Sequence, residues 1–307
     1  DIQRRQWSRE LCELFSVPLS VLPEVLPSAG VFGETGPDVG LPAGVPVCGV
    51  AGDQQAALFG QTCYRAGDAK NTYGTGAFVL MNAGTCRPAD DGRLITTLGC
   101  GPSGEPVFVL EGAIFTAGAV IQWLRDGLGL LDSAEVSGEM AEQVPDNGGV
   151  YLVPGLVGLG APHWDSEVRG AICGITRGTT KNHVVRAALE AMCYRTREVI
   201  EAMASESGLP IAELKVDGGA SANDFLCQYQ ADVLGIDVVR PKDVESTARG
   251  AAYLAGLGCG IWDNAAEFER FLDIDRVFSP TMDKVRVEQY WREWRKTVEQ
   301  VRCSPEL

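Results

Sequence analysis

Residues 67–84 read GDAKNTYGTGAFVLMNAG, and this stretch does most to decide the fold. Its pattern predicts two strands joined by a glycine-bearing turn at residues 73–76. The second strand begins as an apolar run, residues 77–81, which indicates burial. Glycines in such a turn let backbone N–H groups approach a phosphate closely.

The segment before this hairpin places an acidic residue where a strand meets a helix. Residues 45–53, VPVCGVAGD, predict a strand, and a helix is expected to start immediately after Asp53. Asp is a common N-cap at such a junction, and this is the commoner role. A carboxylate there could also accept the proton of an alcohol during phosphoryl transfer, and could hold Mg²⁺ directly or through water. The two roles are compatible, because a cap would fix the rotamer.

Two further glycine-bearing turns are predicted after strands. Glu111-Gly112 follows the strand at 107–110 and precedes an amphipathic helix, and Asp217-Gly218-Gly219 separates a strand at 214–216 from a helix at 223–234. A single such turn is weak support for a phosphate site, but three in one acidic chain are stronger. Because neither G-x-x-x-x-G-K-[ST] nor G-x-G-x-x-G is present, P-loop, Rossmann and protein-kinase folds lack a sequence basis.

The remaining segments predict an α/β chain. Helices are expected near 135–143, 183–203 and 246–257, with Ser246 as an N-cap, and strands at 150–153 and 236–239. The Gly/Pro-rich loop 154–170 holds His163, Trp164 and Asp165, for which a structural role is favoured. The arginines of the long helix alternate with glutamates at helical spacing, which indicates a solvated, ion-paired face, namely Arg186, Arg195 and Arg197 with Glu190, Glu198 and Glu201.

Composition excludes several kinds of protein. The 307 residues carry 41 acidic and 26 basic side chains, a formal charge of −15, so nucleic acid and membrane-surface partners are not expected. Ten cysteines without a C-x-x-C pair predict reduced thiols and a cytoplasmic location. Two histidines leave little for a zinc site or a histidine-based triad. The opening residues, DIQRR, contain neither a methionine nor the apolar core of an export signal.

Several long segments resemble the glycerol kinases, a branch of the FGGY carbohydrate kinase family. They are AGDQQAALFGQ (51–61), AKNTYGTGAF (69–78), GAIFTAGAVIQWLRDGL (112–128), residues 158–192 and VDGGASANDFLCQYQADVLG (216–235). Residues 174–190, GITRGTTKNHVVRAALE, also resemble the second signature of the wider family. The resemblance implies an α/β, actin-like or hexokinase-like ATPase, in which two ribonuclease-H-like domains close around MgATP and a polyol.

The resemblance also implies roles for individual residues. Asp53 corresponds to the catalytic base, Gln54 to a hydrogen-bonding contact with glycerol, and Phe78 to an apolar wall beside the carbon chain of glycerol. Six residues would bind ATP or ADP: Gly74 and Thr75 at the terminal phosphates, Gly118 and Gln122 at the ribose and phosphates, and Gly219 and Asn223 at the adenosine.

The match to the family implies that this is a carboxy-terminal portion. Residues 1–62 would be the tail of the first, polyol-binding domain, and 63–307 the complete second, nucleotide-binding domain. The first domain supplies another phosphate loop and further glycerol contacts, so the 307-residue chain alone is expected to be inactive. Gly44 occupies a position where members inhibited by fructose 1,6-bisphosphate carry an arginine, which argues against that control.

Two alternatives stay open alongside phosphorylation of glycerol to glycerol 3-phosphate. One is a kinase of the same family for another polyol or sugar, such as xylulose or ribulose, although GDQQ and NTYGTG favour glycerol. The other is a non-catalytic nucleotide-binding domain, which would have no need of Asp53. The family resemblance further implies a homo-oligomer, either a dimer or a tetramer.

Overall fold

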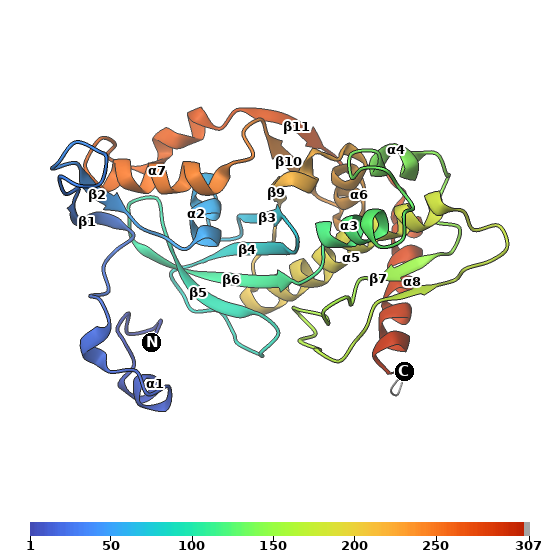
Figure 1. Cartoon of the computed structure of the whole chain (residues 1–307), viewed down its shortest axis with the longest axis horizontal. Coiled ribbons are helices and arrows are strands. Elements are labelled where there is room, and N and C mark those ends of the chain that lie inside the picture. The colour runs from blue at the N-terminus through green and yellow to red at the C-terminus, as the bar shows by residue number, and fades with distance from the viewer. Residues whose placement is uncertain (304–307) are drawn as a thin grey trace.

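A seven-stranded mixed sheet runs through the centre of the computed structural model, which describes residues 1–303 (Figure 1). Its strands are β3 (Ala69–Tyr73), β4 (Ala77–Gly84), β5 (Ile95–Cys100), β6 (Pro106–Ile114), β9 (Glu213–Asp217), β10 (Asp237–Pro241) and β11 (Ile274–Phe278). They lie in the order β11-β10-β9-β3-β4-β6-β5. β9 runs parallel to β3 and to β10, whereas the other neighbours are antiparallel. This arrangement brings the ends of β3 and β9 side by side.

Helices surround this sheet, and two small hairpins complete the fold. The helices are α1 (Arg9–Leu14), α2 (Asp53–Gly60), α3 (Gly118–Asp126), α4 (Ser137–Glu142), α5 (Lys181–Ser207), α6 (Asp224–Leu234), α7 (Ser246–Gly258) and α8 (Lys284–Arg302). Short 3-10 turns occupy Leu19–Val21, Gly219–Ala222 and Ala265–Phe271. β1 (Ala29–Glu34) pairs with β2 (Pro46–Gly49), and β7 (Tyr151–Val153) pairs with β8 (Ala171–Cys173).

Strand β4 shows how both faces of the sheet are covered. Because neighbouring side chains of a strand point to opposite faces, Val79 and Met81 join the main core beneath α5, whereas Leu80 joins a smaller cluster with Leu58 of α2. All four side chains are almost fully buried. The apolar run predicted at 77–81 is therefore buried on both sides.

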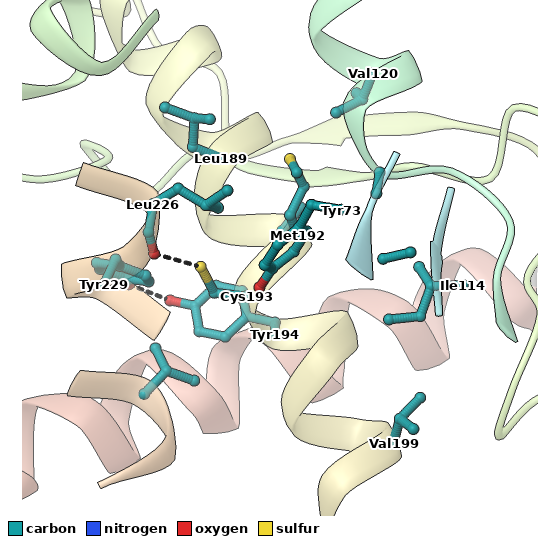
Figure 2. Close-up of a cluster of buried hydrophobic side chains, with 14 of the residues drawn as sticks. Tyr73, Ile114, Val120, Leu189, Met192, Cys193, Tyr194, Val199, Leu226 and Tyr229 are labelled. Atoms are coloured by element: carbon teal, nitrogen blue, oxygen red, sulfur yellow. Dashed lines mark hydrogen bonds between the residues drawn. The ribbon is translucent and has the colours of Figure 1, made fainter. Parts of the chain in front are cut away.

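Helix α5 forms the centre of the main core. Figure 2 shows Met192, Cys193 and Tyr194 of α5 between the sheet and helix α6. The Tyr194 hydroxyl lies 2.6 Å from that of Tyr229, and the Cys193 thiol donates to the carbonyl oxygen of Leu226 over 3.5 Å. These bonds satisfy polar groups that would be costly to bury alone. They fix α6, and with it the turn that precedes α6.

Helices α2 and α7 touch through their backbones. A Cβ atom built on Gly250 of α7 would lie 1.8 Å from the carbonyl oxygen of Ala56, and one on Gly60 of α2 would lie 2.1 Å from that of Ser246. No side chain fits at either point. The β1–β2 hairpin also packs on α7, so glycine contacts hold residues 29–60 against the rest of the chain.

Most of the predicted elements are present, with several corrections. Glu111-Gly112 is not a turn, because β6 continues through it to Ile114. A Cβ on Gly112 would lie 2.2 Å from Val199 Cγ1, so the glycine lets α5 approach the strand. Ser246 is not an N-cap either: it is the first, buried residue of α7, and Glu245 precedes it without a capping side-chain bond. Five further elements were not predicted: β1, β5, β8, β11 and α8.

Candidate functional site

A pocket of about 490 Å³ lies between the β3–β4 turn, the start of α3 and the turn after β9. Its wall contains all six residues predicted to bind nucleotide: Gly74, Thr75, Gly118, Gln122, Gly219 and Asn223. Tyr73, Ile121, Leu189, Met192 and several alanines make much of the remainder apolar. Small-molecule sites typically combine such apolar walls with a few placed polar groups.

The β3–β4 turn is bound to the start of α3. The carbonyl oxygen of Thr75 accepts from the backbone N–H groups of Ala117 and Ala119 at 2.9 and 3.0 Å. The N–H of Gly118 donates to the carbonyl oxygen of Gly74 at 3.0 Å, and a Cβ on Gly118 would lie 2.6 Å from that oxygen. Only glycine permits this approach. The turn is therefore rigid, and Gln122 follows one helical turn beyond it.

The turn after β9 forms another part of the pocket wall. A Cβ built on Gly219 would meet no protein atom within 4 Å, so this residue borders open space. Asn223 is the N-cap of α6: its Oδ1 accepts from the N–H of Leu226 at 3.1 Å, and its amide donates to Ser137 Oγ at 3.1 Å. These bonds hold Asn223 between α4 and α6 at the pocket wall.

Asp53 lies outside this pocket, at the first position of α2. The N-cap is Gly52, which corrects the capping role considered for Asp53. The side chain of Asp53 is exposed, and its Oδ1 accepts from the N–H of Gln54 at 2.8 Å. A carboxylate at a helix N-terminus lies next to unpaired backbone N–H groups of the first turn. Asp53 thus offers solvent a carboxylate of restrained orientation.

The side chain beside Asp53 contacts a lysine that the sequence reading missed. Lys70 Nζ donates to Gln54 Oε1 at 2.6 Å, to Thr72 Oγ1 at 2.8 Å and to the carbonyl oxygen of Phe78 at 3.4 Å. Lys70 is completely buried in β3, and burial lowers its pKa to about 8 against the opposing pull of nearby carboxylates, chiefly Asp217. The predicted polyol contacts, Gln54 and Phe78, therefore share one buried ammonium group.

Two acidic groups lie near Lys70. Burial raises the pKa of Glu111, Lys70 opposes that rise, and Asp53 adds to it. Asp217 ends β9 opposite Thr72, is 1% exposed, and has no hydrogen-bond partner at Oδ1. Asp217 is followed by the turn that carries Gly219, and Lys70 is influenced by the charges of both Asp217 and Asp53.

Within residues 1–303 no cluster of three His, Cys, Asp or Glu side chains could hold a metal ion. Mg²⁺ typically keeps several waters and takes one or two carboxylates together with substrate phosphates. The exposed carboxylate of Asp53 is a hard oxygen ligand of this kind. The residues present therefore fit a Mg²⁺ ion held mainly by phosphate and water, and not one enclosed by protein.

His163, in the loop 154–170, and the arginines of α5 form ion pairs with glutamates of α5. His163 Nε2 lies 3.2 Å from Glu198 Oε2, and Glu198 also pairs with Arg195 and accepts from Trp294 Nε1 at 3.0 Å. Burial would raise the pKa of Glu198, but Arg195 and His163 outweigh it and lower the pKa. Arg186 likewise pairs with Glu190. The predicted ion pairing is confirmed, but these two pairs are buried and not solvated.

Comparison with known proteins gives two adjoining family matches. Residues 69–259 match the C-terminal domain of the FGGY family of carbohydrate kinases, and residues 1–60 match its N-terminal domain. Glycerol kinase of Carboxydothermus hydrogenoformans is 52% identical over 302 residues, 98% of this chain and 60% of that protein. Glycerol kinase of Halorhodospira halophila is 53% identical over 298 residues, 97% of this chain and 59% of that protein. The chain thus spans about 60% of the length of these curated relatives.

Solved structures give the same fold. The Plasmodium falciparum glycerol kinase with ADP has a TM-score of 0.91 at 34% identity, over 100% of this chain and 61% of that one. Gluconate kinase from Lactobacillus acidophilus has a TM-score of 0.87 at 18% identity, over 99% of this chain and 62% of that one, which shows the fold alone. The large mixed sheet therefore has the sugar kinase fold, that of an actin-like ATPase.

Proposed function

The chain belongs to the FGGY family of carbohydrate kinases, and we propose that its protein transfers the γ-phosphoryl group of ATP to glycerol, giving glycerol 3-phosphate and ADP. The observation that carries the proposal is the single pocket wall formed by Gly74, Thr75, Gly118, Gln122, Gly219 and Asn223. The curated relatives named glycerol kinase support the choice of acceptor.

Nucleotide binding follows from the chemistry of this pocket. The apolar side chains, such as Ile121 and Met192, suit a base and ribose, while the glycine turn at Gly74 and Thr75 suits phosphate oxygens. The ADP-bound Plasmodium falciparum structure supports a nucleotide in this fold. We place the terminal phosphates at the β3–β4 turn because its rigid backbone can meet them without reorganising.

Asp53 is our candidate for the catalytic base. Phosphoryl transfer needs little covalent help, and a carboxylate beside the attacking hydroxyl orients it and accepts its proton. Asp53 has the exposure and the restrained carboxylate for this task, with Gln54 next to it to hydrogen-bond the polyol and Phe78 as an apolar wall. When bound, Mg²⁺ neutralises the charge of the phosphates, and Asp53 would hold it, directly or through water.

The domain assignment remains part of this proposal. Residues 1–62 would be the tail of the first domain and 63–307 the second, supported by the two adjoining family matches. We also propose that the protein is cytoplasmic and forms a homo-oligomer. It is not inhibited by fructose 1,6-bisphosphate in this proposal, since Gly44 offers no side chain to a phosphate. Separately, no helix within the described residues has the length and apolar character needed to span a membrane.

The test is ADP release by the complete gene product, coupled to an optical readout, with glycerol, xylulose, ribulose and gluconate offered in turn with MgATP. Glycerol is expected to drive release at the highest kcat/KM. A higher value for another compound would move the protein to the alternative, a different FGGY kinase. Nucleotide binding without release on any acceptor would favour the non-catalytic domain.

A further inference from the structure

Lys70 carries a buried positive charge for which the proposed phosphoryl transfer has no direct use. Its ammonium group, on strand β3, contacts three oxygens: the amide oxygen of Gln54, the hydroxyl of Thr72 and the backbone carbonyl of Phe78. No part of Lys70 is exposed. It is therefore closed off from solvent while touching both residues assigned to the polyol.

We propose that Lys70 is a positioning residue, which holds the side-chain amide of Gln54 so that its NH₂ group faces the acceptor alcohol as a hydrogen-bond donor. The inference rests on the proposed function, since the acceptor is the polyol of that reaction. An ammonium group has three N–H donors and no acceptor, so the atom of Gln54 that faces it must be Oε1. The Nε2 group of the same planar amide must then point elsewhere.

The charge of Lys70 makes this orientation firm. Hydrogen bonds from an ionised donor are stronger than neutral ones, so reversing the Gln54 amide would set two donors against each other in a buried site. A freely rotating glutamine offers either its oxygen or its NH₂ to a ligand. With Oε1 engaged at 2.6 Å, only the donor end is available. The alcohol that receives the phosphoryl group must therefore present an oxygen lone pair to the NH₂ group of Gln54, as a hydroxyl group does.

A purely structural role does not account for this lysine. An isolated buried ammonium is costly, and an apolar side chain of similar length would fill the same space in β3 at less cost. The titratable groups that face Lys70 come from α2, the segment after it, β6 and β9, namely Asp53, Cys63, Glu111 and Asp217, and the Cys63 thiol is neutral because burial raises its pKa to about 12. Three of these are acidic residues around the proposed reaction centre.

The experiment compares two lysines of the same sheet in the complete gene product. Lys215 of β9 is the register partner of Lys70, and its ammonium group donates to the backbone oxygens of Gln61 and Thr62 and to the Thr62 hydroxyl. It also pairs with Glu213, whose side chain is about half exposed. Lys70→Met is expected to raise the KM for glycerol about tenfold or more, the size of a lost charged hydrogen bond, with the KM for ATP within about twofold. Lys215→Met is expected to leave both constants unchanged. An unchanged KM for glycerol in Lys70→Met would overturn the proposal.

A second variant tests the inference even if Lys70→Met does not fold. Gln54→Glu keeps an oxygen for Lys70 to bond, but it replaces the NH₂ donor with a carboxylate oxygen and adds a negative charge. The fold should persist, while the KM for glycerol rises about tenfold or more. If Gln54→Glu binds glycerol as well as the unaltered protein, the donor orientation is wrong. A KM for glycerol in Lys70→Arg that lies closer to that of the unaltered protein than the KM of Lys70→Met does would support a role for the charge.

A measurement independent of turnover separates this inference from the proposed function. The Tm values of Lys70→Met, Gln54→Leu and the double variant form a cycle, and the two effects should not add if the side chains are coupled. If the unaltered protein phosphorylates no polyol, the proposed function is wrong. The Tm values of the three variants would still show whether Lys70 and Gln54 are coupled. Additive effects would overturn that contact.

Discussion

The backbone N–H of Gly118 donates to the carbonyl oxygen of Gly74 at 3.0 Å, which ties the start of α3 to the turn between β3 and β4. Both residues line the pocket, although 44 positions separate them in the chain. Glycine is required at Gly118 because a Cβ would lie 2.6 Å from the bonded oxygen. The β3–β4 turn, at which we place the terminal phosphates, is therefore held in position before any ligand binds, which lowers the cost of ordering it on binding.

Replacing Asp53 should stop the chemistry and spare nucleotide binding. Asp53→Asn keeps the size of the side chain and removes the base, so kcat should fall by roughly a hundredfold or more. Turnover and the Kd for ADP, measured on the same sample, check this. Asp283→Asn is the matched control, because Asn can also cap α8 and Asp283 lies at the N-cap of that helix. Substantial residual turnover in Asp53→Asn would rule out Asp53 as the base.

Gly219→Val should weaken nucleotide binding without harming the fold. A Cβ at Gly219 meets no protein atom within 4 Å, so the added side chain would enter the open pocket. The Kd for ADP, by calorimetry, should rise at least about tenfold, while the Tm stays within about 2 °C. Gly36→Val, at another open glycine far from the pocket, is the control. Unchanged ADP affinity in Gly219→Val would remove the turn after β9 from the nucleotide site.

Gly250→Ala should destabilise the protein. Its Cβ would be 1.8 Å from the carbonyl oxygen of Ala56, so α2 and α7 would have to separate. Overpacking of this kind costs about 1–3 kcal/mol, and the chemical denaturation midpoint should fall accordingly. The start of α2 carries Asp53, so a loss of activity is expected as well. A midpoint equal to that of Gly36→Ala would show that the two helices are not packed through their backbones.

Glu206 should make stability depend on pH. Burial, with the carboxyl group of Asp91 nearby, raises the pKa of Glu206 to about 7, while Glu206 lowers the pKa of Asp91. The folded protein therefore favours protonated Glu206. The contribution of Glu206 to the free energy of unfolding is full below the pKa of about 4.3 that it has in the unfolded chain, and it is lost as the pH rises through 7. Glu206→Gln should raise the Tm at pH 8 and give little gain at pH 5. Equal gains at both values would contradict this.

The sequence could predict the glycine turns of the pocket but not every role of glycine. At residues 73–76 and 217–219 the glycines end strands, and the structure has turns there. Gly112 occurs in a similar context, yet it lies inside β6 because Val199 of α5 presses against it. A glycine needed for a turn and one needed for a close contact look alike in one sequence. Only the packing of α5 separates them.

The burial of charged side chains could not be predicted from the sequence for a related reason. A lysine in a strand is ordinarily placed on the solvent face, yet Lys70 is completely buried because Gln54, Thr72 and Phe78 supply oxygens from three segments. The arginines of α5 were expected in solvent, but Arg195 is buried with Glu198 under α8, a helix that was not predicted. Local spacing predicts which charges pair, and tertiary contacts decide whether they are exposed.

The most direct test of the central claim follows phosphorus from ATP to its acceptor. The complete gene product is incubated with MgATP and glycerol, and phosphorus NMR records the products, with Asp53→Asn as the comparison. The account predicts that the γ-phosphate signal is replaced by that of glycerol 3-phosphate in the unaltered protein and persists in the variant. Loss of γ-phosphate only to inorganic phosphate, or formation of glycerol 3-phosphate at an equal rate in Asp53→Asn, would contradict it.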